Sequence, residues 1–325
     1  MSTAVGVGLL GLGTVGSGVA RAIATRAKRL EAMAGRPIRL VSIAKRDPAS
    51  IRDKDTTAAI DGLVVTQDPF AILDDTNIHV VVEVIGGTSP ARDLQLAAFE
   101  RGKHVVTANK ELVAKYWNEL HEAARLAKRE LRYEAAVAAA VPIIAATRQL
   151  GASRPRIVRG LLNGTTTYIC SQLDAGQSFD DALAEAQRLG YAEADPSADV
   201  DGFDAAYKLS ILVSLLEGRH FPPANVQRTS LREVTPDAVK AARARGKTIR
   251  YLATADFGEK ATKARVGPEE VPLDSLEGSA SGPTNVVRIE TDLAGALVFT
   301  GPGAGGDATA SAILGDVIAI ARSAR

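Results

Sequence analysis

Apolar and polar positions form two alternating kinds of pattern in the first third of the chain. Short runs of largely apolar, β-branched residues stand at positions 5–10, 39–44, 79–85 and 104–108. Longer stretches with helical periodicity stand at 14–29, 90–101 and 110–129. This alternation predicts βαβ units and a parallel sheet. Because the last two strands are continuously apolar, we expect helices on both faces of the sheet, which is a doubly wound α/β fold.

The pattern changes near residue 133. A strand-like run at 156–162, helical stretches at 180–190 and 203–218, and an Asp- and Pro-rich loop between those helices indicate a second, α+β domain. A final amphipathic helix, 309–325, follows the glycine-dense GPGAGGD and is expected to pack back on the first domain. We therefore predict a first domain over residues 1–134, joined by the C-terminal segment 304–325, and a second domain over 135–303.

Composition limits the classes of partner. The 325 residues are 46% apolar, and their 39 basic and 38 acidic side chains nearly cancel. Net charge therefore favours neither nucleic acid nor an anionic membrane, and small-molecule partners are expected. The sequence has no apolar run of about twenty residues and no secretory n-region, and its only cysteine, Cys170, can form neither an internal disulfide nor a thiolate zinc cluster. We expect a cytoplasmic location.

A glycine motif stands between the first strand and the first helix. Gly11-x-Gly13-x-x-Gly16 allows a tight turn, close approach of backbone amides to a pyrophosphate, and packing of helix on strand. The alternative is a glycine-rich turn without a ligand. The strand–motif–helix context favours a Rossmann-type dinucleotide-binding domain.

The end of the second strand bears on the choice of cofactor. An acidic residue there would bind the adenosine ribose 2′-hydroxyl, but the strand ends in Lys45 and Arg46. Two cations suit a 2′-phosphate and favour NADP. In the alternative, both are a solvated strand end, and the nearby Asp47 leaves NAD open.

Lys110 follows an apolar strand and opens a helix, with Asn109 as the expected N-cap. A cation at the positive end of a helix dipole costs local stability, so we expect a functional role at the carboxyl edge of the sheet. Gly87 and Thr88, at the end of another strand, would line the same crevice. The dipole and low dielectric are expected to lower the pKa of Lys110 toward the range of an acid or base.

Lys208 lies one helical turn after Asp204. A purely structural interpretation has Asp201 capping the helix and Asp204 forming an i,i+4 pair with Lys208. The apolar neighbours of Lys208 and the carboxylates of the preceding loop, which include Glu193 and Asp199, instead suit a small zwitterionic substrate.

These residues stand in stretches that resemble the homoserine dehydrogenase family. The matching stretches cover essentially the whole chain in family order and read GLGTVGSGV, VVTANKELVA, EAAVAAAVPII, GLLNGTTTYI, AEAQRLGYAEADPSADVDGFDAAYKLSIL and GPGAGGDATAS. The resemblance implies reversible NAD(P)-dependent oxidation of L-homoserine to L-aspartate 4-semialdehyde, a step of threonine and methionine biosynthesis.

The resemblance also implies roles for individual residues. Lys208 would be the proton donor, and Lys110 would contact both the cofactor and the substrate oxygen. Glu193, Asp199 and Asp204 would hold homoserine and support Lys208. Further cofactor contacts are implied at Thr14, Val15, Thr88 and Gly305. A monovalent cation, usually sodium, would bind through Glu134 and the backbone carbonyls of Val137, Ala139 and Val141.

Assembly and regulation are implied as well. The family forms homodimers or homotetramers through the second domain, which would be both catalytic and dimerisation domain. Ala138-Ala139-Ala140 stands where the family usually has glycines, and because alanine disfavours positive φ, this departure argues against an occupied cation site. In the stretch GLLNGTTTYI, Thr167 stands where the family usually has Asn. Many relatives carry a C-terminal regulatory module, whereas this chain stops at Arg325, so we expect no threonine feedback through such a module.

Two other classes of protein remain alternatives. A phosphorylating semialdehyde dehydrogenase shares the fold but needs a cysteine nucleophile, and Cys170 has apolar neighbours and no adjacent base, which predicts an inert core thiol. An NADP-binding sensor without catalytic activity would bind cofactor and turn nothing over. The lysine pair and the acidic loop favour the enzyme.

Overall fold

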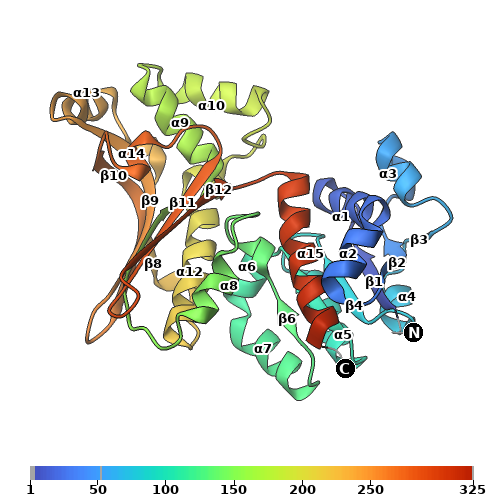
Figure 1. Ribbon diagram of the computed structural model, residues 1–325. Helices are drawn as coiled ribbons and strands as arrows, with labels where there is room; N and C mark the ends of the chain where they lie inside the picture. The colour runs from blue at the N-terminus through green and yellow to red at the C-terminus, as the bar shows by residue number, and fades with distance from the viewer. Residues whose placement is uncertain (1–3, 52, 324–325) are drawn as a thin grey trace. The chain divides into compact units, whose positions relative to one another are not determined.

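The computed structural model describes residues 4–51 and 53–323. Contacts within the chain divide it into two compact parts, named unit 1 and unit 2 and described separately (Figure 1). Unit 1 consists of the residues up to Ala140 and those from Gly305 onward, and unit 2 runs from Val141 to Ala304. The division falls a few residues later than the predicted boundary between 134 and 135.

Unit 1 is built on a six-stranded parallel sheet with strand order β3-β2-β1-β4-β5-β6. The strands are β1 (Val5–Leu10), β2 (Ile38–Ala44), β3 (Val64–Thr66), β4 (Val80–Glu83), β5 (His104–Thr107) and β6 (Leu131–Arg132). Every residue of β1 and β4 is buried, as the continuously apolar runs predict. The order reverses between β1 and β4, which is the arrangement of dinucleotide-binding doubly wound sheets, and confirms the predicted fold class.

Helices cover both faces of this sheet. They are α1 (Thr14–Thr25), α2 (Ala27–Ala34), α3 (Lys54–Ala59), α4 (Pro69–Asp74), α5 (Ala91–Glu100), α6 (Lys110–Lys115), α7 (Trp117–Leu126) and α15 (Gly306–Ser323). α15 packs against α1 (Figure 1). Glycine permits this close packing, because a Cβ on Gly18 would lie only 2.8 Å from the carbonyl oxygen of Gly306.

Three predicted helices differ from the observed ones by more than two residues at one end. The expected helix 14–29 breaks at Arg26, and the expected helix 110–129 breaks at Tyr116, where φ is −117° and −113°. Each break redirects the following helix, so that its own apolar side chains, such as Leu30 and Leu120, are buried. The predicted helix 309–325 begins earlier, at Gly306, and its residues 324 and 325 lie outside the described residues.

Unit 2 contains a second six-stranded sheet, with order β12-β11-β7-β9-β10-β8. Its strands are β7 (Pro155–Leu161), β8 (Val226–Arg228), β9 (Lys247–Phe257), β10 (Thr262–Pro272), β11 (Thr284–Thr291) and β12 (Ala296–Pro302). Neighbouring strands are antiparallel except β8 and β10, which are parallel. The predicted α+β character of this part is confirmed.

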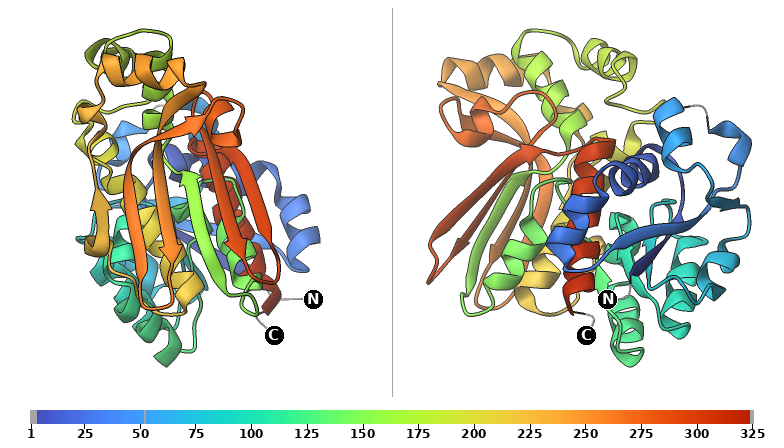
Figure 2. Two further views of the ribbon diagram at one scale, coloured as in Figure 1. Left: turned by 90° about the vertical axis from the view of Figure 1, so that its left-hand side faces the viewer. Right: turned by 45° about the vertical axis from the view of Figure 1, so that its right-hand side comes forward.

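The helices of unit 2 are α8 (Ile143–Gln149), α9 (Gly164–Asp174), α10 (Phe179–Arg188), α11 (Ser197–Val200), α12 (Phe203–Glu217), α13 (Pro236–Ala244) and α14 (Leu276–Ser279). α9 and α12 pack on β9. In the left view of Figure 2, the strands of this sheet lie in front of α12 and turn a broad face to the viewer. Arg288, Arg159 and Arg265 share one face of the sheet, because residue 288 pairs with 159, 159 with Thr254, and Thr254 with 265. It is the face away from α12, since Tyr251, which points to the opposite face, lies against Gly202 at the start of α12.

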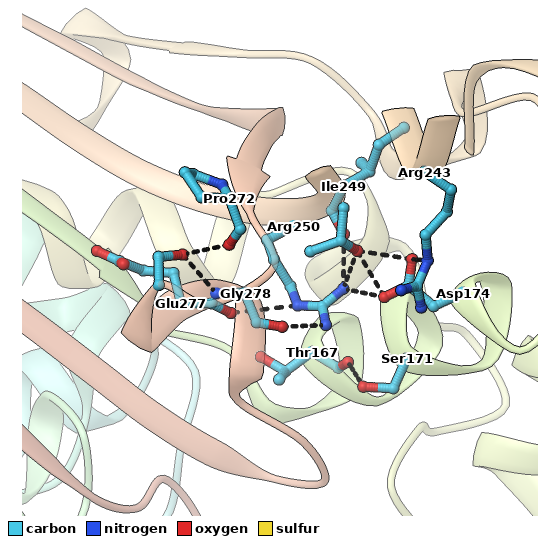
Figure 3. Close-up of polar contacts among 11 residues, drawn as sticks. Thr167, Ser171, Asp174, Arg243, Ile249, Arg250, Pro272, Glu277 and Gly278 are labelled. Carbon is cyan, nitrogen blue, oxygen red and sulfur yellow. Dashed lines mark hydrogen bonds and ion pairs between the residues drawn. The ribbon is translucent and has the colours of Figure 1, made fainter. Parts of the chain in front are cut away.

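A buried ion pair anchors the C-terminal end of α9 (Figure 3). Nη1 of Arg250, on β9, donates to Oδ2 of Asp174 at 2.6 Å, and both side chains are less than a tenth exposed. Nη2 of the same guanidinium donates to the carbonyl oxygen of Gly278 in α14 at 2.7 Å. One cation therefore joins α9, β9 and α14.

Among the described residues, no helix is long and apolar enough to cross a membrane.

Candidate active site

The glycine motif forms the turn between β1 and α1. Gly11 has φ +104°, which favours glycine, and a Cβ on Gly16 would lie 2.2 Å from the carbonyl oxygen of Gly11. A Cβ on Gly13 would meet nothing within 4 Å, so this residue faces open space at the start of α1. The three glycines thus serve the turn, the approach of a ligand to the backbone, and the packing of helix on strand.

The start of α1 lies beside the start of α15. Thr14 and Val15 are the first residues of α1, and a Cβ on Gly306 would lie 2.8 Å from the carbonyl oxygen of Thr14. The preceding residue, Gly305, has φ +118° and is exposed. The fold of unit 1 therefore brings together three positions for which cofactor contacts are predicted, Thr14, Val15 and Gly305.

The two basic residues after β2 lie close to the glycine turn. Nζ of Lys45 donates to the carbonyl oxygen of Leu12 at 3.3 Å, and the Lys45 side chain is half-buried. Arg46 is exposed. The Lys45 ammonium is therefore held at the dinucleotide motif, whereas Arg46 faces solvent.

Asn109 caps the helix that Lys110 opens, as predicted. Its Oδ1 accepts from the backbone N–H of Leu112 at 3.1 Å, and its Nδ2 donates to the carbonyl oxygen of Gly87 at 2.6 Å. Lys110 is half-buried, as is Thr88. The loops that follow β4 and β5 therefore meet at the carboxyl edge of the sheet, where ligands bind in such folds.

In unit 2, Lys208 and Asp204 form a buried pair on α12. Nζ of Lys208 donates to Oδ2 of Asp204 and to the carbonyl oxygen of Leu162, both at 2.7 Å. Lys208 is 8% exposed and Asp204 is 6% exposed. A wet surface pair is thereby ruled out, and the ammonium is held by one carboxylate and one carbonyl.

Asn163 joins this pair to Asp199. Its Nδ2 donates to Oδ1 of Asp199 at 2.6 Å and to Oδ2 of Asp204 at 2.9 Å, while its Oδ1 accepts from the N–H of Thr166 and caps α9. Sequence reasoning did not single out Asn163. The Asn-Gly-Thr-Thr segment after a strand is an N-cap signal that would have placed it at a helix start.

Burial raises the pKa of Asp199, and the neighbouring charge of Asp204 raises it further. Hydrogen bonds from Asn163 and Thr165 and the charge of Lys208 oppose that rise. The site therefore holds two carboxylates close together, and one of them accepts a proton more readily than an ordinary aspartate.

A glycine turn brings these two carboxylates together. Gly202, between α11 and α12, has φ +80°, and a Cβ there would lie 2.5 Å from the hydroxyl oxygen of Tyr251. Gly202 is the N-cap residue of α12, so the purely structural interpretation, in which Asp201 caps this helix, is wrong on that point. Asp201 instead accepts a hydrogen bond from the hydroxyl of Ser230 at 2.6 Å.

Glu193 lies in the loop between α10 and α11, and its side chain is exposed. Its backbone carbonyl accepts from Nε2 of Gln187 at 3.0 Å. No hydrogen bond within residues 4–51 and 53–323 joins its carboxylate to Asp199, Asp204 or Lys208.

The segment predicted to bind a cation begins at the 3-10 helix Glu134–Ala136. Glu134 is 8% exposed, and Val137, Ala139 and Val141 are buried. Ala138 and Ala139 have φ +56° and +46°, so the alanines adopt the left-handed conformation that we expected them to avoid. That conformation costs an alanine roughly 1–2 kcal/mol, which the surrounding packing must offset.

Cys170 is buried in α9, and burial raises the pKa of its thiol to about 12. A thiolate is the nucleophile in cysteine chemistry, so this finding confirms the predicted inert core thiol and disfavours a phosphorylating dehydrogenase. Within the described part of the chain, no group of three or more His, Cys, Asp or Glu side chains could hold a metal ion.

Comparisons with known proteins agree with this geometry. Residues 11–134 match the family model "Homoserine dehydrogenase, NAD binding domain", and residues 142–318 match the model "Homoserine dehydrogenase". The homoserine dehydrogenase of Corynebacterium glutamicum is 40% identical over 99% of this chain and 73% of its own length.

Two solved structures are also similar. A homoserine dehydrogenase from Thiobacillus denitrificans has a TM-score of 0.93 and 41% identity, covering 98% of this chain and 73% of that one. A hyperthermophilic archaeal homoserine dehydrogenase in complex with NADPH has a TM-score of 0.81 and 29% identity, covering 97% of both chains. The chain belongs to the homoserine dehydrogenase family, the NAD(P)-dependent oxidoreductases that interconvert L-homoserine and L-aspartate 4-semialdehyde in threonine and methionine biosynthesis.

Proposed function

We propose that Lys208 and Lys110 carry the proton chemistry of this reaction and that Asp204, Asp199 and Glu193 hold the substrate. The observation that carries the proposal is the buried Lys208–Asp204 pair, whose ammonium is fixed by a carboxylate and a carbonyl at 2.7 Å each. A buried lysine with oriented partners at a cluster of carboxylates is the arrangement expected of an acid–base group.

The two lysines act on one hydroxyl group in this proposal. In the oxidative direction a neutral lysine accepts the hydroxyl proton, and in the reductive direction the ammonium polarises the aldehyde and donates that proton. Bound nicotinamide supplies the hydride acceptor or donor. Asp204 orients Lys208, and Asp199, Glu193 and nearby backbone hold the ammonium and carboxylate groups of homoserine. The exposed Glu193 would have to turn toward the substrate when it binds.

Cofactor contacts are proposed at the turn and the strand ends of unit 1, namely at Gly11, Gly13, Thr14, Val15, Gly16, Lys45, Arg46, Gly87, Thr88, Lys110 and Gly305. NADP is the preferred cofactor in this proposal. Its support is the ammonium of Lys45, which lies 3.3 Å from the carbonyl oxygen of Leu12 in the glycine turn, with Arg46 as a second exposed cation. A carboxylate at this strand end would repel a 2′-phosphate, and the two cations attract it.

A monovalent cation, sodium by preference, is proposed to bind through Glu134 and the carbonyls of Val137, Ala139 and Val141. Support comes from the left-handed pair at 138 and 139, because strain of this kind is retained where a fixed backbone arrangement is needed. A melting temperature higher in sodium chloride than in tetramethylammonium chloride of equal ionic strength would support binding. Equal melting temperatures would argue against it.

A homodimer or homotetramer is proposed to form through unit 2. The broad face of its sheet carries charged pairs of both signs, including Arg159–Glu269 and Arg288–Glu290, so a copy turned by 180° can present complementary charge. Light scattering should give at least twice the monomer mass for the natural chain and a monomer for Arg159→Glu combined with Arg288→Glu. A cytoplasmic location stays a prediction of the sequence.

Initial rates test the catalytic proposal directly. Homoserine-dependent reduction of NADP should exceed that of NAD in kcat/KM. Lys208→Ala should lower kcat by about 10²–10⁴ while the Kd for NADPH stays the same, because proton transfer is lost and cofactor binding is kept. The exposed Lys240 of α13 provides the matched control, and Lys240→Ala should behave as the natural chain. Turnover retained in Lys208→Ala would overturn the assignment.

A further inference from the structure

A fully buried carboxylate lies at the carboxyl end of β4. Glu83 is 0% exposed, and its Oε1 accepts from the backbone N–H groups of Ile85 at 2.8 Å and Gly86 at 3.4 Å. Its Oε2 accepts from Nε2 of Gln95 at 2.8 Å and from the hydroxyl of Thr107 at 2.7 Å. The backbone amides can only donate, so this carboxylate acts as an acceptor for the loop that follows its own strand.

Thr107 links the hydrogen bonds of Glu83 to the next strand. It ends β5, is fully buried, and its Oγ1 accepts the backbone N–H of Asn109 at 3.0 Å while its hydroxyl donates to Glu83. Asn109 in turn caps α6 and donates through Nδ2 to the carbonyl oxygen of Gly87. The hydrogen bonds therefore form a closed path from the end of β4 through the end of β5 and back to the loop after β4.

Both loops on this path carry residues of the proposed site. The loop after β4 contains Gly87 and Thr88, and the loop after β5 leads into Lys110. Gly86 and Gly87 have φ +73° and +67° and are exposed. Because these glycines have no side chains to pack, backbone hydrogen bonds are what fixes their position.

We propose that Glu83 and Thr107 are positioning residues that set the distance between the β4 loop, with its cofactor contacts, and Lys110. This inference rests on the proposed function. A shift of about 1 Å in a reacting group costs roughly a hundredfold in rate, so breaking the path should reduce catalysis even though neither residue touches a ligand.

Thr107→Val tests the connection, because valine has the same shape and lacks the hydroxyl. We expect kcat for homoserine oxidation to fall about tenfold to a hundredfold and NADPH to bind more weakly. Thr107→Ser keeps the hydroxyl and should recover most of kcat. Fluorescence titration of NADPH gives a readout that does not depend on turnover.

Lys103→Met is the matched control. Lys103 is also buried, immediately before β5, and its Nζ donates to the carbonyl oxygens of Asp75 at 2.7 Å and Ile78 at 2.6 Å, at the opposite edge of the same sheet. Its loss should lower the melting temperature without changing kcat or the Kd for NADPH. Asn109→Ser provides a milder second variant, because serine still caps α6 and only the bond to Gly87 is lost.

The outcomes separate this inference from the proposed function. Suppose that the natural chain oxidises homoserine and that Thr107→Val melts no lower than Lys103→Met. If Thr107→Val then keeps full kcat and NADPH affinity, the inference is wrong and the function stands. An equal loss of kcat in Thr107→Ser and Thr107→Val would also contradict it. If the natural chain binds NADPH but does not oxidise homoserine, the function fails instead. If Thr107→Val does not fold, unchanged kinetics in Asn109→Ser overturn the inference.

Discussion

Removal of the Arg250 guanidinium is expected to destabilise unit 2 more than the loss of any surface ion pair. Arg250 is 4% exposed and donates to Asp174, to the carbonyl of Glu277 at 3.2 Å and to that of Gly278 at 2.7 Å (Figure 3). In Arg250→Met, the Asp174 carboxylate loses its buried cation but keeps the hydroxyl of Thr248 as a donor and the partly exposed Arg243, whose Nε lies 3.5 Å from Oδ1.

The magnitude follows from the burial of both partners. Breaking a buried pair by removing one partner costs about 3–5 kcal/mol when the other charge stays buried without compensation, and because Arg243 remains beside Asp174 we expect the lower end, about 3 kcal/mol. For a folding unit of this size the melting temperature should then fall by roughly 6–12 °C. Replacing both charges, in Arg250→Met with Asp174→Leu, removes the carboxylate that has lost its buried cation and should recover part of that loss. The carbonyls of α14 still lose their donor, so recovery is incomplete.

Thermal and urea unfolding monitored by circular dichroism would measure these differences. Arg188→Met is the control, because Arg188 pairs with Glu185 at 3.4 Å with a side chain that is 70% exposed, and such pairs contribute little. A loss in Arg250→Met no larger than in the control, or a double variant less stable than the single one, would refute the reasoning.

Further predictions concern four single sites. The pKa of Asp199 is raised in the fold, so its protonation favours the folded state at low pH, and this contribution to stability is lost as pH rises through the folded pKa. Asp199→Asn should therefore raise the melting temperature at neutral pH. This gain should vanish in acid, where Asp199 of the natural chain is protonated. In the natural chain the KM for homoserine should rise as Asp199 is protonated, and a flat KM profile would contradict its role. Cys170 should resist iodoacetamide until unfolding, as mass spectrometry can check. Ala139→Gly should increase the free energy of unfolding by about 1 kcal/mol. Asn163→Asp keeps the cap of α9 but adds a third carboxylate beside Asp199 and Asp204, so kcat/KM should fall at neutral pH and recover partly in acid.

The elements that sequence predicted well are those whose signals are local. The first strand, the glycine motif and the cap of α6 at Asn109 all lie within a few residues of what defines them. Continuous apolar runs then indicated a sheet covered on both faces, as unit 1 has, whereas the order of its strands was not predicted. The breaks at Arg26 and Tyr116 escaped prediction, since the helical periodicity continues through both of them.

Of the second sheet, only β7 was predicted. β9 is buried on both faces from Thr248 to Ala255, although polar Thr248, Arg250 and Thr254 alternate with apolar residues along much of it, so the pattern does not reveal its burial. Its buried polar side chains are satisfied by distant partners, as Thr248 is by Asp174, 74 positions away. The next strand, β10, contains Pro268 and ends in Pro272, which argue against a strand when the sequence is considered alone. Only the tertiary fold supplies the distant hydrogen-bond partners of the buried polar side chains in β9.

In the candidate site, too, contacts between residues distant in the sequence could not be predicted. Two asparagines show how the fold makes such contacts. Asn109 and Asn163 each cap a helix with the side-chain oxygen and use the amide nitrogen to hold a second segment, Gly87 in one unit and two aspartates in the other. Serine, threonine or aspartate would serve as a cap equally well, but only asparagine offers an acceptor and two donors at once. The cap could be predicted from local sequence. The hydrogen-bond partners of the two amide nitrogens lie 22 to 41 positions away in the sequence. The contacts by which Asn109 and Asn163 position a lysine or its carboxylate partner therefore depend on the fold.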